Sequence, residues 1–181
     1  KIILYQGMLA EGRGLESSII AASRVPNNTF CLVFLGFSTS RYKDRLKDIS
    51  KRNNFKRLKI VDAVPWEELV EWTISADISL VLIENVSTSY YLAAPNKIYE
   101  SIMAEIPYIA SNFPEIQRVN KMANSGILVD PGKIQNISNA MEMLLHDSEL
   151  YKNLRSNAKI AKKTYNWEKE KVILTNIIDS I

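Results

Sequence analysis

The sequence predicts an α/β protein built on a doubly wound, mostly parallel sheet of about six strands, Rossmann-like, with helices on both faces. Short apolar runs alternate along the chain with longer segments whose apolar residues recur at helical spacing. The short runs are apolar nearly throughout, rather than at every second residue, as expected for strands that are covered on both sides. With 181 residues, 46% of them hydrophobic, the chain is long enough to bury such a core as one domain.

In the first half of the chain, a strand and a helix follow each other repeatedly. Apolar runs bounded by turn residues predict strands at residues 2–5, 30–35, 58–61 and 78–83. Helical spacing predicts helices at residues 15–23, 41–52 and 65–75. The second of these helices places Tyr42, Leu46 and Ile49 on one face among basic residues. The third opens with Pro65 followed by acidic residues, which suit the positive end of a helix.

The second half continues the pattern after an irregular stretch. Residues 84–94 are rich in Ser and Tyr and predict no regular element. Strands are expected at residues 108–110 and 126–129. Helices are expected at residues 95–106, 115–122, 134–145, 149–163 and 167–181. Pro95 opens the first of these helices, its core face is expected to hold Ile98, Ile102 and Met103, and Pro107 ends it.

The stretch 95–111, PNKIYESIMAEIPYIAS, has the chemistry of an anion-binding edge. Asn96 and Lys97 lie in the first helical turn, where free N–H groups and the positive end of the helix dipole favour phosphate. Glu100 follows about one turn later and could point inward as a ligand-binding carboxylate. Each residue also has an explanation without a ligand: Glu100 could point outward, Lys97 could be solvated, and Asn96 could cap the helix.

A glycine loop from Gly7 to Gly14 follows the first strand and precedes a helix, where a tight backbone can approach a phosphate. The spacing is not that of the dinucleotide-binding GxGxxG fingerprint. Arg13, between Gly12 and Gly14, could reach a diphosphate or could equally lie in solvent.

Composition excludes several function classes. A formal net charge of +3 demands neither nucleic acid nor an acidic membrane as partner. The single histidine, His146, is expected at the surface, and no zinc-ligand spacing, Walker lysine or nucleophile elbow is present. Cys31 is expected to be a small buried hydrophobe, which fits a cytoplasmic protein. The chain starts without Met, directly in a strand, so we expect a further N-terminal portion in the complete protein.

Two further groups of residues that could bind a ligand are better explained by the fold. The basic run from Arg41 to Lys59 is expected to be a solvated helix face rather than a surface for anionic lipid or nucleic acid, because Asp44 and Asp48 interrupt it and no aromatic residues are interleaved. The tryptophans at positions 66, 72 and 167 are expected to pack into the core rather than to stack on a ligand.

Taken together, the chain resembles the C-terminal, nucleotide-sugar-binding domain of GT-B-fold retaining glycosyltransferases of the large bacterial group 1 family. The resemblance covers nearly the whole chain. It rests on the stretches YQGMLAEGRGLE, LKIVDAVPWEELVEWTISADISLVLI, PNKIYESIMAEIPYIAS and GILVDPGKIQNISNAMEMLL.

The resemblance implies roles for residues in a donor site. At the donor diphosphate it implies Gly7, Arg13, Gly14, Asn96 and Lys97; at the ribose hydroxyls, Glu100; and at the nucleobase, the strand end with Val64 and Pro65. Ser111, at the end of the signature stretch, is assigned to the same site. Charge on the leaving diphosphate would be stabilised by Arg13, Lys97 and helix N–H groups, with Glu100 as the third catalytic-site residue and no required metal or other cofactor.

The chain departs from the family pattern at four positions. Leu92 stands where a second glutamate usually meets the donor sugar, and Met8 where an arginine is common. Arg13 replaces a usual lysine. Glu105 stands where a glycine usually ends the signature helix, so either it adopts a C-cap conformation at a cost of about 1 kcal/mol or the helix ends differently.

The resemblance implies an enzyme that transfers a sugar from a nucleotide-diphosphate sugar, UDP-linked, to a saccharide or lipid-linked acceptor in surface polysaccharide synthesis. Its own N-terminal domain would be a partner, and the last helix, 167–181, would pack back toward that domain and leave its apolar face partly exposed here. Peripheral contact with the inner face of the plasma membrane is also expected to be compatible with this role. Two alternatives remain open: a nucleotide-sugar epimerase of the same fold, and a nucleotide-binding domain that has lost activity.

Overall fold

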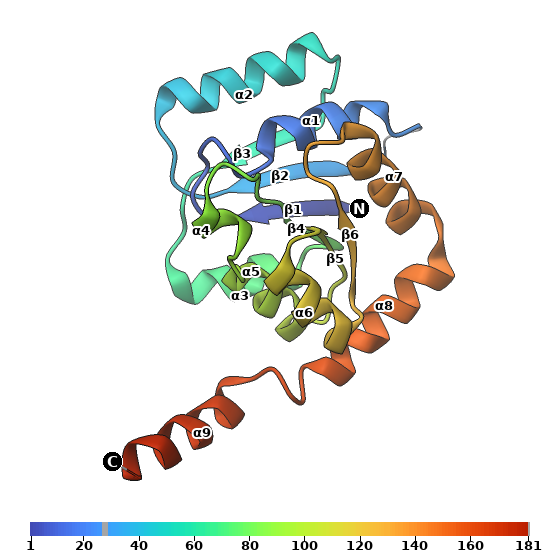
Figure 1. Ribbon diagram of the computed structural model, residues 1–181. Helices are drawn as coiled ribbons and strands as arrows, with labels where there is room; N and C mark the ends of the chain where they lie inside the picture. The colour runs from blue at the N-terminus through green and yellow to red at the C-terminus, as the bar shows by residue number, and fades with distance from the viewer. Residues whose placement is uncertain (27–28, 181) are drawn as a thin grey trace.

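A computed structural model describes residues 1–26 and 29–180 and confirms the fold class (Figure 1). One sheet of six parallel strands has the order β3-β2-β1-β4-β5-β6. The strands are β1 (Ile2–Gln6), β2 (Cys31–Leu35), β3 (Leu58–Val61), β4 (Ile78–Val81), β5 (Tyr108–Ser111) and β6 (Gly126–Val129). Such an order, growing outward from β1 in one direction and from β4 in the other, is that of a doubly wound sheet.

The helices cover both faces of this sheet. They are α1 (Leu15–Arg24), α2 (Ser40–Arg52), α3 (Trp66–Ile74), α4 (Thr88–Tyr91), α5 (Asn96–Met103), α6 (Pro114–Ala123), α7 (Ile134–His146), α8 (Ser148–Ala161) and α9 (Trp167–Asp179). Figure 1 shows α1, α2 and α7 over one face and α3, α5 and α6 over the other, with α8 running between the layers. Residue 181, the expected end of the last helix, lies outside the described residues.

Side chains of the central strands alternate between two apolar layers. Ile3 and Tyr5 of β1 pack under α1 and α7, whereas Leu4 between them packs on the side of α3. All three side chains are at most 2% exposed. This two-sided burial is why the strands read as continuous apolar runs in the sequence.

Several local expectations were wrong. Residues 84–94 contain the short helix α4, whose first turn is capped by Ser87: its hydroxyl accepts from Tyr90 N at 3.3 Å. Met103 is 39% exposed because it lies about 100° around α5 from Ile102, at the edge of the face that buries Ile98 and Ile102. Trp66 and Trp167 are 75% and 64% exposed, and Cys31 is only half-buried, with its thiol directed to the Arg57 carbonyl.

Trp72 is the tryptophan that packs as expected, since it is half-buried against the apolar layer under α3. The C-terminal helix α9 extends away from the body (Figure 1). None of its residues is buried, and its large apolar side chains are about half exposed: Val172, Ile173, Leu174, Ile177 and Ile178. The exposed apolar face expected for this segment is therefore present. Across residues 1–26 and 29–180, no helix is both long and apolar enough to cross a bilayer.

Glu105 ends α5 in the conformation expected from the sequence, with a φ of 58° just beyond the C-cap Ala104. Its backbone N–H reaches the Ile102 carbonyl at 3.1 Å, and its carboxylate contacts Lys162 Nζ at 3.2 Å. The left-handed backbone costs a residue with a Cβ about 1 kcal/mol relative to glycine.

We therefore expect Glu105→Gly to raise the free energy of unfolding relative to Glu105→Gln by about 0.5–1 kcal/mol. Both variants lose the half-exposed ion pair with Lys162, so the comparison isolates the backbone strain. Urea denaturation of the two variants measures the difference. Equal midpoints would show that the left-handed position carries no strain.

Candidate functional site

The carboxyl ends of β1 and β4 meet at the point where the strand order reverses, which is where doubly wound sheets bind ligands. A cavity of about 350 Å³ lies there. Its lining comes from the β1 end, the glycine loop, α3 and the start of α5: Gln6, Gly7, Arg13, Leu69, Ala94, Pro95, Asn96, Lys97 and Glu100. The fold thus brings together the two stretches that the sequence singled out, although they are about eighty positions apart.

The start of α5 presents unpaired backbone donors to this cavity. Pro95 is the N-cap residue, with an extended backbone (φ −64°, ψ 138°), and no side chain caps the helix. The first helical N–H bond is that of Ile98, which donates to the Pro95 carbonyl at 3.0 Å. The N–H groups of Asn96 and Lys97 therefore remain free, and Asn96 is exposed rather than serving as a cap. This end of α5 is suited to an anion.

Glu100 points inward. Its Oε2 accepts a hydrogen bond from Gln6 Nε2 at 2.6 Å, and Gln6 Oε1 in turn accepts from Thr73 Oγ1 at 2.8 Å. Gln6 and Thr73 are 4% and 5% exposed, so this chain of side chains joins α5, β1 and α3 beneath the cavity. The inward alternative for Glu100 is therefore confirmed, and its second oxygen stays free for a ligand.

Sequence reasoning missed the roles of Gln6 and Thr73. The available signal was a polar side chain that closes an apolar strand directly before a glycine. Thr73 carried no such signal, because it lies in a helix where it also bonds back to the Leu69 carbonyl at 2.8 Å.

Lys97 lines the cavity and lies against the buried ring of Tyr5. Its Nζ is 5.0 Å from the ring centroid of Tyr5, whose hydroxyl donates to the Met8 carbonyl at 2.9 Å. Burial lowers the pKa of Lys97, the charge of Arg13 lowers it further, and Glu100 opposes both. The ammonium is therefore partly desolvated and close enough to Arg13 to feel a like charge, a state that a bound anion would relieve.

Arg13 faces the same cavity from the glycine loop. Its guanidinium carbon is 4.6 Å from the ring centroid of Tyr90, and its Nε is buried with no hydrogen-bond partner. Among the described residues, no carboxylate forms an ion pair with Arg13 or Lys97. Two cations that form no ion pair, beside an uncapped helix start, suit a doubly charged anion, although Glu100 places one carboxylate in the same cavity.

Four of the residues assigned to the site lie outside the cavity lining. Gly14 is the N-cap of α1 and packs on Leu82, and Val64 and Pro65 form the β3–α3 connection, where Val64 is half-buried against the apolar layer. Ser111 needs a correction, because it is fully buried and its hydroxyl donates to the Ile83 carbonyl at 2.6 Å and accepts from the Ile83 N–H at 2.9 Å. It joins the ends of β4 and β5 under the site and offers nothing to a ligand.

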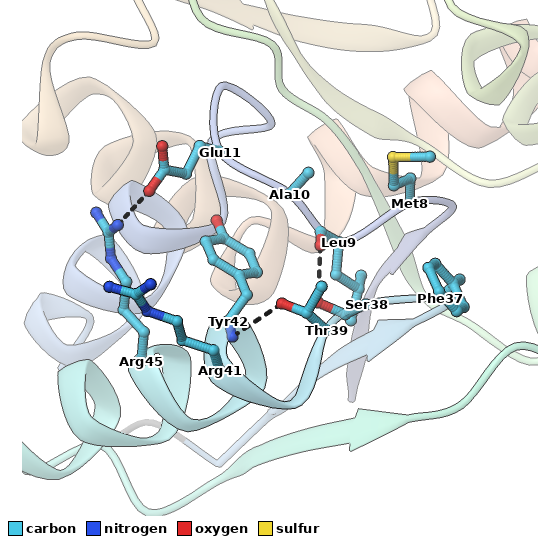
Figure 2. A pocket seen from close by; sticks show the side chains of 10 residues that line it. All are labelled: Met8, Leu9, Ala10, Glu11, Phe37, Ser38, Thr39, Arg41, Tyr42 and Arg45. Atoms are coloured by element: carbon cyan, nitrogen blue, oxygen red, sulfur yellow. Dashed lines mark hydrogen bonds and ion pairs between the residues drawn. The ribbon is translucent and has the colours of Figure 1, made fainter.

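A larger cavity of about 530 Å³ lies on the other side of the glycine loop, between that loop and α2 (Figure 2). Figure 2 shows Met8 and Phe37 at one end and Arg45, paired with Glu11, at the other. In this cavity Arg45 is paired with Glu11 and Glu16 and Thr39 caps the start of α2, whereas Arg41 forms no ion pair among the described residues. The larger cavity therefore has one unpaired cation and a capped helix start, where the smaller one has two unpaired cations and an uncapped helix start.

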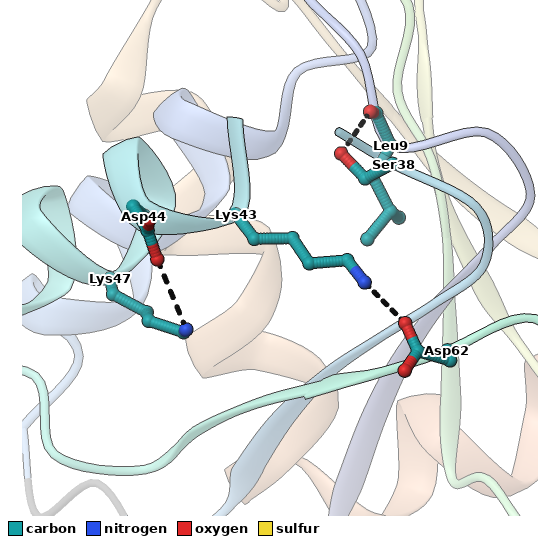
Figure 3. A network of polar contacts seen from close by, with 6 residues as sticks. All are labelled: Leu9, Ser38, Lys43, Asp44, Lys47 and Asp62. Carbon is teal, nitrogen blue, oxygen red and sulfur yellow. Dashed lines mark hydrogen bonds and ion pairs between the residues drawn. The ribbon is translucent and has the colours of Figure 1, made fainter. Parts of the chain in front are cut away.

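Polar contacts fix the loops at this edge of the sheet (Figure 3). Ser38 Oγ donates to the Leu9 carbonyl at 2.8 Å, which ties the glycine loop to the β2–α2 connection. Lys43 pairs with Asp62, which ties α2 to the end of β3. No cluster of three or more side chains of the metal-binding types was found in residues 1–26 and 29–180.

Comparison with known proteins gives a consistent family. The model of the family described as glycosyl transferases group 1 matches residues 1–161. A search of curated proteins by sequence gave no match. Many solved structures share the fold.

Three of these structures illustrate the likeness. Sucrose-phosphate synthase (tll1590) from Thermosynechococcus elongatus is 22% identical, with a TM-score of 0.84 over 99% of this chain and 45% of that chain. Anabaena Alr3699/HepE in complex with UDP and glucose is 16% identical, with a TM-score of 0.85 over 99% of this chain and 48% of that one. The C-terminal domain of a glycosyl transferase group 1 family protein (LpcC) from Francisella tularensis is 20% identical, with a TM-score of 0.74 over 92% and 86%. The chain thus spans about half the length of the first two proteins.

Proposed function

The chain belongs to the group 1 glycosyl transferases, and on this premise we propose that it forms the donor-binding half of an enzyme that transfers a sugar from a UDP-linked donor. The observation that supports this most strongly is the cavity itself. Two cations without counter-ions, Arg13 and Lys97, face the open start of α5, while Glu100 presents a carboxylate about one turn further along the helix. Diphosphate and ribose are adjacent in a nucleotide diphosphate, and they require this pairing of positive and acceptor groups.

In the proposed mechanism, the bond between the anomeric carbon of the sugar and the β-phosphate oxygen breaks as an acceptor hydroxyl oxygen bonds to that carbon. Negative charge builds on the leaving diphosphate, which can take the proton that the acceptor hydroxyl loses. The N–H groups at the start of α5, the Lys97 ammonium and the Arg13 guanidinium would stabilise that charge, which is the main catalytic contribution expected of this half. Glu100 would accept hydrogen bonds from the ribose hydroxyls and fix the nucleotide. Gly7 and Gly14 would shape the loop, Val64 and Pro65 would pack near the base, and no metal is part of the proposal.

The nucleotide is supported by a structural neighbour, since Anabaena Alr3699/HepE has been solved with UDP and with UDP-glucose. For the remaining partners we keep the proposals that follow from the family: a saccharide or lipid-linked acceptor, surface polysaccharide synthesis, and an N-terminal domain of the same protein that covers the apolar face of α9. A cytoplasmic location with peripheral contact at the membrane completes this proposal. The chain alone is then expected to bind nucleotide weakly and to transfer nothing, so turnover by residues 1–181 would contradict it.

Calorimetric titration with UDP, GDP and ADP tests the proposal. UDP is expected to bind most tightly. We expect Glu100→Ala to weaken UDP binding about tenfold or more, because a charged acceptor is lost, while inorganic pyrophosphate binds no more weakly than to the wild type. Glu115→Ala is the matched control, since that carboxylate lies on α6 and pairs with Arg118. Equal losses for UDP and pyrophosphate in Glu100→Ala would contradict the ribose role.

A second candidate function is supported by two side chains at the family's usual contact positions. Leu92 and Met8 are 52% and 59% exposed and carry no charge toward the cavity. They favour a domain that binds nucleotide without transferring sugar. Incubation of the full-length protein with UDP-sugars separates the two functions: release of UDP in the presence of acceptor supports the transferase, and tight nucleotide binding without release supports the binding domain.

A further inference from the structure

Tyr90 contacts the candidate site only through Arg13, yet it is the side chain on which the geometry of that arginine depends. We propose that Tyr90 is a positioning residue that holds the Arg13 guanidinium toward the diphosphate of the donor. The inference rests on the proposed function for the identity of the anion, but the geometry behind it is independent of the nucleotide.

The ring of Tyr90 serves Arg13 in place of a carboxylate partner. The guanidinium carbon lies 4.6 Å from the ring centroid, which is within the range of a cation–π contact. Two carboxylates of neighbouring segments are engaged elsewhere, since Glu11 pairs with Arg45 and Glu100 accepts from Gln6. Glu84, whose N–H donates to Gly12 O, forms no ion pair among the described residues. An aromatic face stabilises the cation without neutralising it, so the N–H groups at the guanidinium edge stay available to phosphate oxygens.

Tyr90 is itself held in place. It lies in α4, whose start is capped by Ser87, and its ring is packed against the apolar cluster between the sheet and α5. Its carbonyl accepts from Ala93 N at 3.3 Å. The ring therefore has a fixed position relative to α5, which also carries Lys97 and Glu100.

The glycine loop is fitted onto the same segment. Gly12 O accepts from Glu84 N at 2.9 Å, and Gly12 has a φ of 78°. A Cβ at Gly12 would lie 3.2 Å from Tyr90 Cε2 and 3.2 Å from Val86 Cγ2. This close fit between the loop and the segment with α4 places Arg13, the next residue, against the Tyr90 ring. Arg13 therefore has little freedom to rotate away from the cavity.

Lys97, in the lining of the same cavity, shows the same arrangement, with its ammonium 5.0 Å from the centroid of Tyr5. Each of the two cations thus lies on an aromatic face, and neither forms an ion pair among the described residues. The two cations repel each other, and a doubly charged anion between them would offset that repulsion more than a singly charged one. Removing one aromatic face should therefore reduce anion affinity without removing any charge.

Binding of UDP and of inorganic pyrophosphate to four forms of the chain tests the proposal by calorimetry: wild type, Tyr90→Phe, Tyr90→Leu and Tyr91→Leu. Tyr91 is a matched control, since it neighbours Tyr90 in α4 but stacks on Phe113 at 5.1 Å. We expect Tyr90→Leu to weaken both ligands about fivefold to tenfold, and Tyr90→Phe and Tyr91→Leu to stay within about twofold of wild type. In an Arg13→Ala background, Tyr90→Leu should have no further effect.

The outcomes separate this inference from the proposed function. Unchanged binding by Tyr90→Leu, or an equal loss with and without Arg13, would overturn the positioning role. The positioning role would also be overturned if both Tyr90→Leu and Tyr91→Leu lost anion affinity in proportion to their loss of thermal stability. If the wild type binds pyrophosphate but not UDP, the nucleotide proposal fails while the Tyr90 comparison on pyrophosphate still decides the inference. If the wild type binds neither ligand, both fail.

Discussion

Replacing Lys97 by methionine is expected to weaken binding of UDP by about 2–3 kcal/mol, or roughly 30- to 150-fold, because a charge-assisted contact to the diphosphate is lost. Methionine keeps an apolar side chain beside Tyr5. It also removes an ammonium group whose pKa is already lowered by burial. Thermal stability should therefore be unchanged or slightly higher. Calorimetric titration measures the affinity, and Lys121→Met, on the exposed side of α6, is the control. If Lys97→Met is as stable as the wild type and binds UDP with the same affinity, Lys97 does not contact the diphosphate.

The lowered pKa of Lys97 adds a pH dependence to this expectation. A bound diphosphate would raise that pKa again, so binding takes up a proton once the pH exceeds the lowered pKa of the free chain, and affinity falls as pH rises toward the usual lysine value of 10.5. Stability has the opposite sign, because the folded chain then binds fewer protons than the unfolded chain and its free energy of unfolding rises. Lys97→Arg should abolish both slopes, since a guanidinium stays charged.

Gly36→Ala is expected to have the largest effect on stability, a loss of about 2–4 kcal/mol in the free energy of unfolding. Gly36 is buried at the end of β2 with a φ of 150°, and a Cβ there would lie 1.8 Å from the carbonyl oxygen of Gly7. The colliding atom belongs to the backbone, so the glycine loop must move. UDP affinity should therefore fall together with stability.

Gly132→Ala is the matched control for this substitution. Gly132 is exposed, and the nearest atom to its Cβ would be Asp130 Oδ1 at 3.4 Å. Urea denaturation of both variants measures the free energies of unfolding. A Gly36→Ala variant as stable as Gly132→Ala would mean that the approach of Gly7 to Gly36 does not constrain the loop.

Much of the fold could be predicted because the strands are buried on both faces and the helices are amphipathic. A strand that is buried on both faces is a continuous apolar run, which can be recognised without knowing its neighbours in the sheet. All six strands were predicted in this way. The helix α4 could not be found, because four residues are too few for a period. The exposure of Trp66 and Met103 was also missed, since in the sequence an apolar residue at the start of a helix or at the edge of its buried face looks the same as one in the core.

The candidate site shows the same division. Pro95 and the residues after it indicated the helix start through local chemistry, whereas the direction of Glu100 stayed open until the family resemblance favoured the inward one, which the structure shows. The partners that fix this carboxylate come from other elements: Gln6 had a sequence signal that was missed, and Thr73 had none. Ser111 was assigned to the ligand because of its position in the stretch, whereas the sheet turns its hydroxyl to Ile83.

The structure of the chain in complex with UDP tests the central claim most directly. The account predicts diphosphate oxygens within about 3.2 Å of Lys97 Nζ, the Arg13 guanidinium and the first N–H groups of α5, and ribose hydroxyls on the Glu100 carboxylate. UDP seated instead in the larger cavity beside Met8 and Phe37, or an empty α5 cavity in crystals of a chain that calorimetry shows to be saturated, would contradict it.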